Sequence, residues 1–101
     1  MGNLHHAEQL YQQGLDALNT TYPDKATHAY KCFAAACFAD PTWFYAWYQY
    51  GNNNVDLKMR EAAIPAYYRA LQCEVSDSDR AKCLSNLAWQ LEETGDILRA
   101  F

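Results

Sequence analysis

The chain has 101 residues, half of them hydrophobic and 15% aromatic, with a formal net charge of −4. This composition is too apolar for a disordered chain, and the length suits one domain with a modest core. The eight Lys and Arg residues form no basic patch, so we expect no nucleic-acid partner. No apolar run reaches the ~18 residues of a membrane span, so we expect no membrane partner. The first residues lack the features of a signal peptide, and we therefore expect a cytoplasmic protein.

The first two predicted helices are separated by a loop with the sequence NTTYPDK. Asn3 is a plausible N-cap for a helix that reaches about Asn19. Pro23 is expected to open the second helix, because proline suits the first helical turn. Asp40 precedes Pro41, so it should end the second helix and cap the third.

The later helices are predicted from their capping and breaking residues. The third should fray in the segment that starts at Gly51, because Gly and Asn tolerate left-handed backbone. Ser76 or Ser78 is expected to cap the fifth helix, Gly95 to end it, and Asp96 to cap a sixth. No alternation of Val, Ile and Thr indicates a strand, which predicts an all-α fold.

Three segments of the chain align on one another at a spacing of 37 residues. Leu10, Trp47 and Leu84 are equivalent in this alignment. A fixed period of this length indicates stacked supersecondary units, and such stacks provide extended concave surfaces for binding. Four residues beyond each of these positions lies a small residue: Gly14, Gly51 and Ala88.

The pattern resembles the tetratricopeptide repeat, a unit of two antiparallel helices. The resemblance covers nearly the whole chain, as one domain (1–101) with repeats at about 7–43, 44–80 and, incomplete, 81–101. It implies a right-handed α-solenoid of about two and a half repeats, with five full helices and the start of a sixth. Small residues would let the two helices of a unit cross closely, with large side chains between them. The middle copy carries the pattern most fully, at Trp47, Tyr50, Gly51, Ala63, Tyr67 and Ala70.

The third copy lacks its second helix, so one face of the fifth helix should be without a partner. One consequence would be a homodimer formed through the C-terminal end. Another is that the chain is the substrate-recruiting segment of a larger enzyme, because its middle repeat is similar to repeats that precede bacterial glycosyltransferase domains. Candidate residues for the dimer interface are Leu91, Ile97, Leu98 and Phe101.

The resemblance implies that the first helix of each unit lines an inner groove, which would bind a peptide or protein segment. Gln12, Gln49 and Asn86 occupy equivalent places, and a row of carboxamides can bond to a peptide backbone of any sequence. Such a row is similar to the amide ladder of the O-linked N-acetylglucosamine transferase repeats. Ordinary solvated surface residues are the alternative interpretation. Further candidates for peptide binding are Tyr11, Tyr48, Asn52, Lys82 and Trp89.

Acidic residues lie beside these candidates and are opposed mainly by Lys82. If they face the groove, a basic or neutral segment would be favoured; the alternative is a solvated charged face. The acidic residues are Glu8, Asp56, Glu92 and Glu93.

The sequence contains no arrangement typical of catalysis, and we predict no enzymatic activity, cofactor or metal site. None of the four cysteines forms a CxxC pair. Cys32 and Cys37 would face different directions on a helix, so they do not share one partner. We expect all four cysteines to act as small apolar packing residues.

Overall fold

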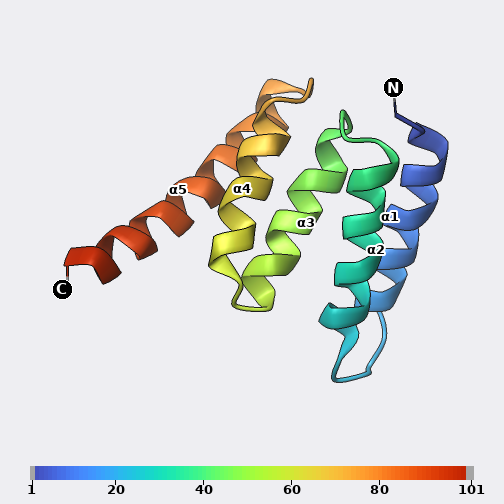
Figure 1. Ribbon diagram of the computed structural model, residues 1–101, viewed down its shortest axis with the longest axis horizontal. Helices are drawn as coiled ribbons and strands as arrows, with labels where there is room; N and C mark the ends of the chain where they lie inside the picture. Colours follow the sequence, from blue (N-terminus) through green and yellow to red (C-terminus); the bar gives the residue numbers. More distant parts are fainter. Residues whose placement is uncertain (1, 100–101) are drawn as a thin grey trace.

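The computed structural model describes residues 2–99, with side-chain environments for residues 2–95. This part of the chain is all-helical, as predicted, and each helix packs chiefly against its neighbours in the sequence. Figure 1 shows the helices side by side in chain order. No described helix is long and apolar enough to cross a bilayer. The helices are α1 (Leu4–Leu18), α2 (Lys25–Ala39), α3 (Phe44–Asp56), α4 (Arg60–Leu71) and α5 (Asp77–Arg99).

Two of the predicted caps are confirmed. The side chain of Asn3 accepts a hydrogen bond from the backbone N–H of His6 at 3.1 Å, at the start of α1. The hydroxyl of Ser76 accepts one from the N–H of Asp79 at 3.3 Å, at the start of α5. Each side chain satisfies a backbone donor that has no partner within its helix, which is why these helices begin where they do.

Two other predicted helix starts are displaced. Pro23 lies two residues before α2, because residues 23–24 form a turn. Asp40 ends α2 but does not cap α3, which begins at Phe44. Its carboxylate instead accepts hydrogen bonds from the N–H of Thr42 at 3.0 Å and from the Thr42 hydroxyl at 2.6 Å. These bonds fix a local turn, and α3 starts only after it.

The prediction that α3 frays from Gly51 is wrong. Asn53 and Asn54 are buried and helical, and Asn53 donates a hydrogen bond to the carbonyl of Ala26 in α2 at 3.0 Å. This contact between helices keeps the segment in α3. The chain reverses later, at Lys58, which takes the left-handed conformation with φ 63°.

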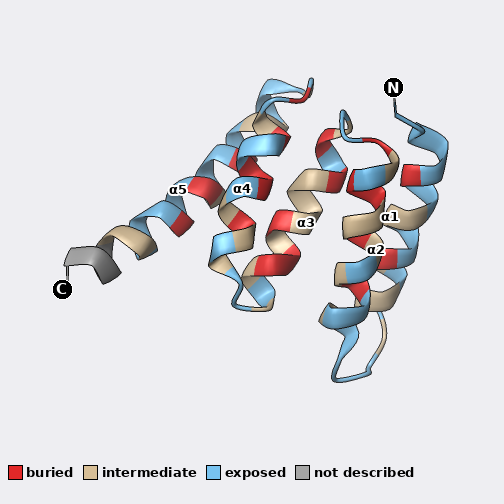
Figure 2. Ribbon diagram, in the orientation of Figure 1, coloured by how far each residue is buried: buried red, intermediate tan, exposed pale blue. Residues whose placement is uncertain are grey.

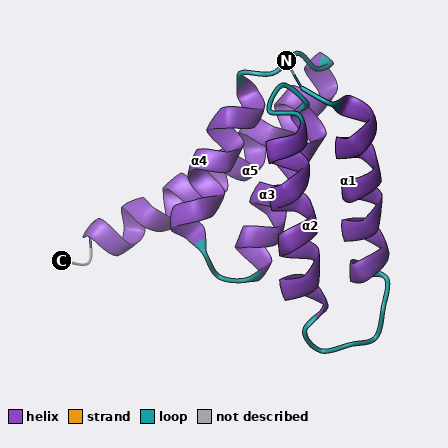
Figure 3. Cartoon of the chain, turned by 45° about the vertical axis from the view of Figure 1, so that its right-hand side comes forward, coloured by secondary structure: helices purple, strands orange, loops and turns teal. Residues whose placement is uncertain are grey.

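The predicted boundary between a fifth and a sixth helix is also wrong for the described residues. α5 is 23 residues long and continues through Gly95 and Asp96 to Arg99. A side chain added at Gly95 would meet no described atom within 4 Å, so no packed neighbour turns the chain there. The second half of α5 therefore extends away from the other helices (Figures 1 and 3).

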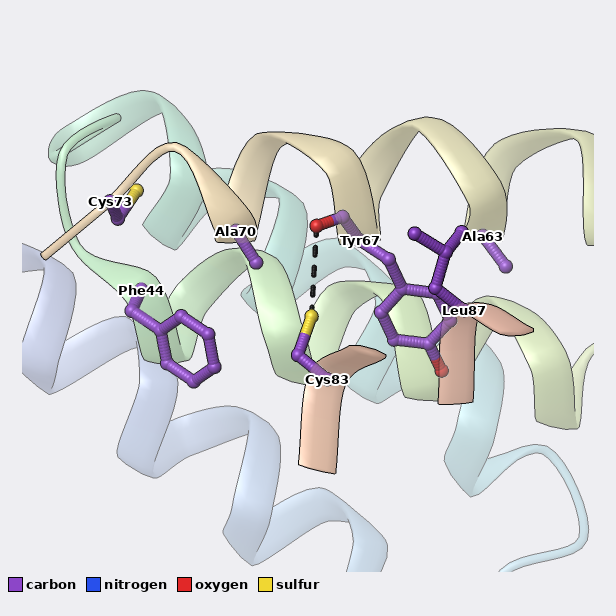
Figure 4. Close-up of a cluster of buried hydrophobic side chains, with 7 residues drawn as sticks. All are labelled: Phe44, Ala63, Tyr67, Ala70, Cys73, Cys83 and Leu87. Carbon is purple, nitrogen blue, oxygen red and sulfur yellow. Dashed lines mark hydrogen bonds between the residues drawn. The ribbon is translucent and has the colours of Figure 1, made fainter. Parts of the chain in front are cut away.

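Glycine permits close helix crossings between α1 and α2 and between α3 and α4. A Cβ atom at Gly14 would lie 2.5 Å from the ring of Phe33, and one at Gly51 would lie 2.7 Å from the ring of Tyr67. The predicted role of these small residues is confirmed. Figure 2 shows buried positions where neighbouring helices meet. Figure 4 shows one core cluster, which joins α3, α4 and α5 through Phe44, Ala63, Tyr67, Ala70, Cys73, Cys83 and Leu87.

Three cysteines are buried packing residues, as predicted, and Cys32 is half-buried. Burial raises the pKa of the Cys37 thiol to about 12 and that of the Cys83 thiol to about 11. Burial also raises the pKa of Cys73. The Cys83 thiol donates to the carbonyl of Tyr67 at 3.6 Å (Figure 4). These three side chains remain protonated at neutral pH.

Candidate functional site

A polar network joins α3, α4 and α5. The Asn52 side-chain oxygen accepts hydrogen bonds from the Tyr67 hydroxyl at 2.5 Å and from the Asn86 amino group at 3.0 Å. The same Asn86 amino group is 3.2 Å from the hydroxyl of Tyr48. Burial raises the pKa of Tyr67, so its hydroxyl stays protonated and donates. Three predicted site residues, Tyr48, Asn52 and Asn86, are thus brought together.

This network borders a groove between α3 and α5, made of two adjacent hollows that we call the α3–α5 groove. The first hollow has a volume of about 300 Å³ and the second about 330 Å³. Trp89 lines both hollows and is 62% exposed. The first hollow is lined by Asn52, Val55, Asp56, Tyr67, Asn86, Trp89 and Gln90. The second shares Val55, Trp89 and Gln90 with it and adds Lys58, Arg60, Glu61 and Glu93.

The charges along the groove are unevenly distributed. Arg60 donates from Nε to the Gln90 side-chain oxygen at 3.1 Å, and its guanidinium lies 3.8 Å from the Glu93 carboxylate. Asp56 is the one charged residue that lines the first hollow. Within the described part of the chain no cation lies at ion-pair distance from Asp56. The first hollow therefore has an unopposed negative charge.

The predicted carboxamide row does not share one set of partners. Gln12 is exposed and donates to the Asp16 carboxylate at 2.9 Å within α1. Gln49 accepts from the Asn52 amino group at 3.2 Å within α3. Of the three carboxamides, Asn86 alone bonds to another helix among the described residues. That all three contact one ligand remains a prediction.

Tyr11 and Lys82 lie outside the lining of the groove. The Tyr11 ring packs against the rings of Phe33 and Trp43, with centroids 5.8 and 5.1 Å apart, so it contributes to the core between helices. Lys82 is exposed, and its amino group lies 3.7 Å from the Asp79 carboxylate. The hydroxyl of Tyr45 donates to the same carboxylate and lowers the pKa of Asp79.

No described residue covers one face of α5, as predicted. Leu84 is 49% exposed, Leu91 is 42% exposed, and Ala88 between them is exposed. At the equivalent positions of α1 and α3, aromatic rings cover Gly14 and Gly51. Of the other predicted interface residues, the side chains of Ile97 and Leu98 and the whole of Phe101 lie outside the described residues.

Sequence reasoning did not identify all the residues of the groove. Val55, Arg60 and Gln90 were missed, because they do not recur at equivalent positions of the repeat. The sequence also does not predict a separate hollow of about 750 Å³, which lies between α3 and α4. That hollow is mainly apolar in its lining residues, which are Trp47, Tyr50, Ala62, Ile64, Pro65, Ala66, Tyr68 and Arg69.

Comparison with known proteins adds no family assignment to these observations. No protein-family model matches the chain, and no curated protein matches it closely enough to count as a relative. The tetratricopeptide interpretation thus depends on the repeated positions and on the packing of neighbouring helices.

Proposed function

We propose that this protein is a non-catalytic interaction module that binds a peptide or protein segment in the α3–α5 groove. The observation that carries this proposal is the exposure of Trp89 beside a polar network that is already formed. A large exposed indole is unfavourable in water unless a partner covers it, and tryptophan is enriched at binding hot spots. The groove combines apolar surface at Val55 and Trp89 with several polar groups, and fixed polar groups in a concave site orient a ligand.

The polar network suits the backbone of an extended segment. Asn86 uses its amino group within the network, and its carbonyl oxygen accepts no hydrogen bond from the described residues. That oxygen is available to an N–H group of a bound peptide. Because Asn52 and Tyr48 hold the Asn86 amino group in place, little side-chain entropy is lost on binding. Because these contacts are made to the peptide backbone, the α3–α5 groove would bind peptides of varied sequence.

The repeat interpretation extends this proposal to the wider molecule. If α1, α3 and α5 are the first helices of tetratricopeptide-like units, Gln12 and Gln49 continue the binding face beyond the groove. A longer segment would then contact all three carboxamides. We also propose that the protein is cytoplasmic, as predicted from the sequence.

Selection from a displayed peptide library tests this proposal. Peptides that bind the protein should lose about tenfold or more in affinity with Trp89→Ala, because hot-spot truncations commonly cost this much. Asn86→Leu should also weaken binding. Leu84→Ala is the matched control, since Leu84 is exposed on a different face of α5. Selected peptides that bind both groove variants as tightly as the wild type would contradict the proposal.

A second candidate function is self-association through the open face of α5. Leu84, Ala88 and Leu91 follow one another at spacings of four and three, so they form one apolar stripe on the helix. A second copy could cover this stripe about a two-fold axis. Light scattering over a concentration series should detect a dimer of the wild-type protein. The double variant Leu84→Glu with Leu91→Glu should be a monomer. A wild-type monomer at every concentration would count against this function.

A further inference from the structure

The first hollow of the α3–α5 groove combines three kinds of group that attract a cation. Asp56 supplies a carboxylate, and Trp89 supplies an exposed indole face. Asn86 supplies a carboxamide oxygen that accepts no hydrogen bond from the described residues. Each of these groups binds an ammonium or guanidinium favourably: the carboxylate by charge, the indole through its quadrupole and the amides by accepting hydrogen bonds.

Of the two cations that line the neighbouring second hollow, Arg60 is paired. Arg60 is held by Gln90 at 3.1 Å and by Glu93 at 3.8 Å, so its charge is paired in the second hollow. Lys58 also lines the second hollow, where Glu61 is present as well. The Asp56 charge is also a cause of the raised pKa of Tyr67, after burial, Tyr48 and Cys83.

Other occupants suit the first hollow less well. An acidic side chain would face Asp56 and be repelled, and an apolar one would leave polar groups of the lining without partners. A long basic side chain can lay its methylene groups against Val55 and Trp89 while its charged end reaches Asp56. A volume of about 300 Å³ suits one such side chain and excludes a helix.

We infer that the first hollow is a subsite for one arginine or lysine side chain of the bound segment. This inference rests on the proposed function and specifies the chemistry of its ligand. The net charge of −4 would also attract basic segments toward the protein before they bind.

Two peptides that differ only in charge test the subsite. One is a capped peptide with the sequence Gly-Ala-Ala-Arg-Ala-Ala-Gly, and the other contains citrulline, a neutral analogue of arginine, at the central position. Binding is followed by NMR through the Trp89 indole N–H and the Asn86 side-chain amide. We expect the arginine peptide to bind about fivefold to tenfold more tightly, from one cation–π contact and one partly exposed ion pair.

Asp56→Asn should remove the ion-pair share of this difference and leave only the cation–π share, about twofold to fivefold, while the affinity for the citrulline peptide stays unchanged. Glu92→Gln is the matched control: Glu92 is an exposed carboxylate of α5 that does not line the hollow, so the preference for arginine should persist. Peptides that bind the groove with equal affinity would overturn the subsite but leave the proposed function standing. A preference that is as large in Asp56→Asn as in the wild type would also overturn it. Failure of both peptides to shift any signal of the groove would contradict the proposed function itself.

Discussion

Single residues set the distance between helices in this protein. At Gly51 an added methyl group would meet the buried ring of Tyr67 at 2.7 Å, a distance that requires the ring or the helix to move. We expect Gly51→Ala to lower the free energy of unfolding by about 1–3 kcal/mol, as overpacking does. Gly95→Ala is the control. Its Cβ meets no described neighbour, and alanine loses less conformational entropy than glycine in a helix, so it should raise that free energy by about 0.5–1 kcal/mol. Urea unfolding measures both changes, and a neutral Gly51→Ala would mean that the crossing is not tight.

The buried thiols make stability depend on pH. Cys83 has a pKa of about 11 in the folded protein because of burial, whereas an unfolded cysteine titrates near 9.0. Between pH 9 and pH 11 the unfolded chain loses a thiol proton that the folded chain keeps. The contribution of Cys83 to the free energy of unfolding is therefore fully present below pH 9 and declines as the pH rises toward 11. Each such group contributes a slope of at most about 1.4 kcal/mol per pH unit. Urea unfolding at several pH values should show a smaller decline for Cys83→Ala than for the wild type; identical slopes would contradict this account.

At the scale of the elements, one side chain of α5 caps the end of α4. Arg80 donates hydrogen bonds to the carbonyls of Leu71 at 2.7 Å and of Cys73 at 3.0 Å. These carbonyls lie at the C-terminal end of α4, where a positive charge is favourable. We expect Arg80→Met to lower the free energy of unfolding by about 1.5–3 kcal/mol. Lys82→Met, a control on exposed α5 surface, should change it by less than about 0.5 kcal/mol. Equal effects in thermal unfolding would show that the cap contributes nothing.

The helix ends show which features can be predicted from sequence. Asn3 and Ser76 could be identified as caps because each bonds to backbone only three residues away. The continuation of α3 through Asn53 could not be predicted, because it depends on a carbonyl of α2 that is distant in sequence. Likewise, Gly95 ends a helix only where a following element packs against it, and no described side chain does so.

The candidate site was predictable to a similar extent. Asn52, Asn86 and Trp89 were identified because they are on or beside equivalent positions of the repeat, and all three line the first hollow. Arg60 and Gln90 are 30 residues apart, and their hydrogen bond arises only from the way α5 crosses the start of α4. Periodicity reports which face of a helix a residue occupies, but the crossing of two helices decides which side chains meet.

At the scale of the whole molecule, the protein is a flat stack of helices. Its principal dimensions are 44 × 34 × 21 Å, so the thinnest direction corresponds to about two helix diameters. Because each helix packs mainly on its sequence neighbours, α5 at the end of the stack has one packed side and one open side. The groove and the open stripe both belong to this terminal helix, which concentrates the candidate binding surfaces at one end of the molecule.

NMR chemical-shift mapping with a library-selected peptide can locate the bound segment, which we propose lies in the α3–α5 groove. We expect the largest changes at the Trp89 indole N–H and at the side-chain amides of Asn52 and Asn86. Changes confined to the stripe at Leu84, or to the apolar hollow at Trp47, with the groove signals unmoved, would contradict this proposal.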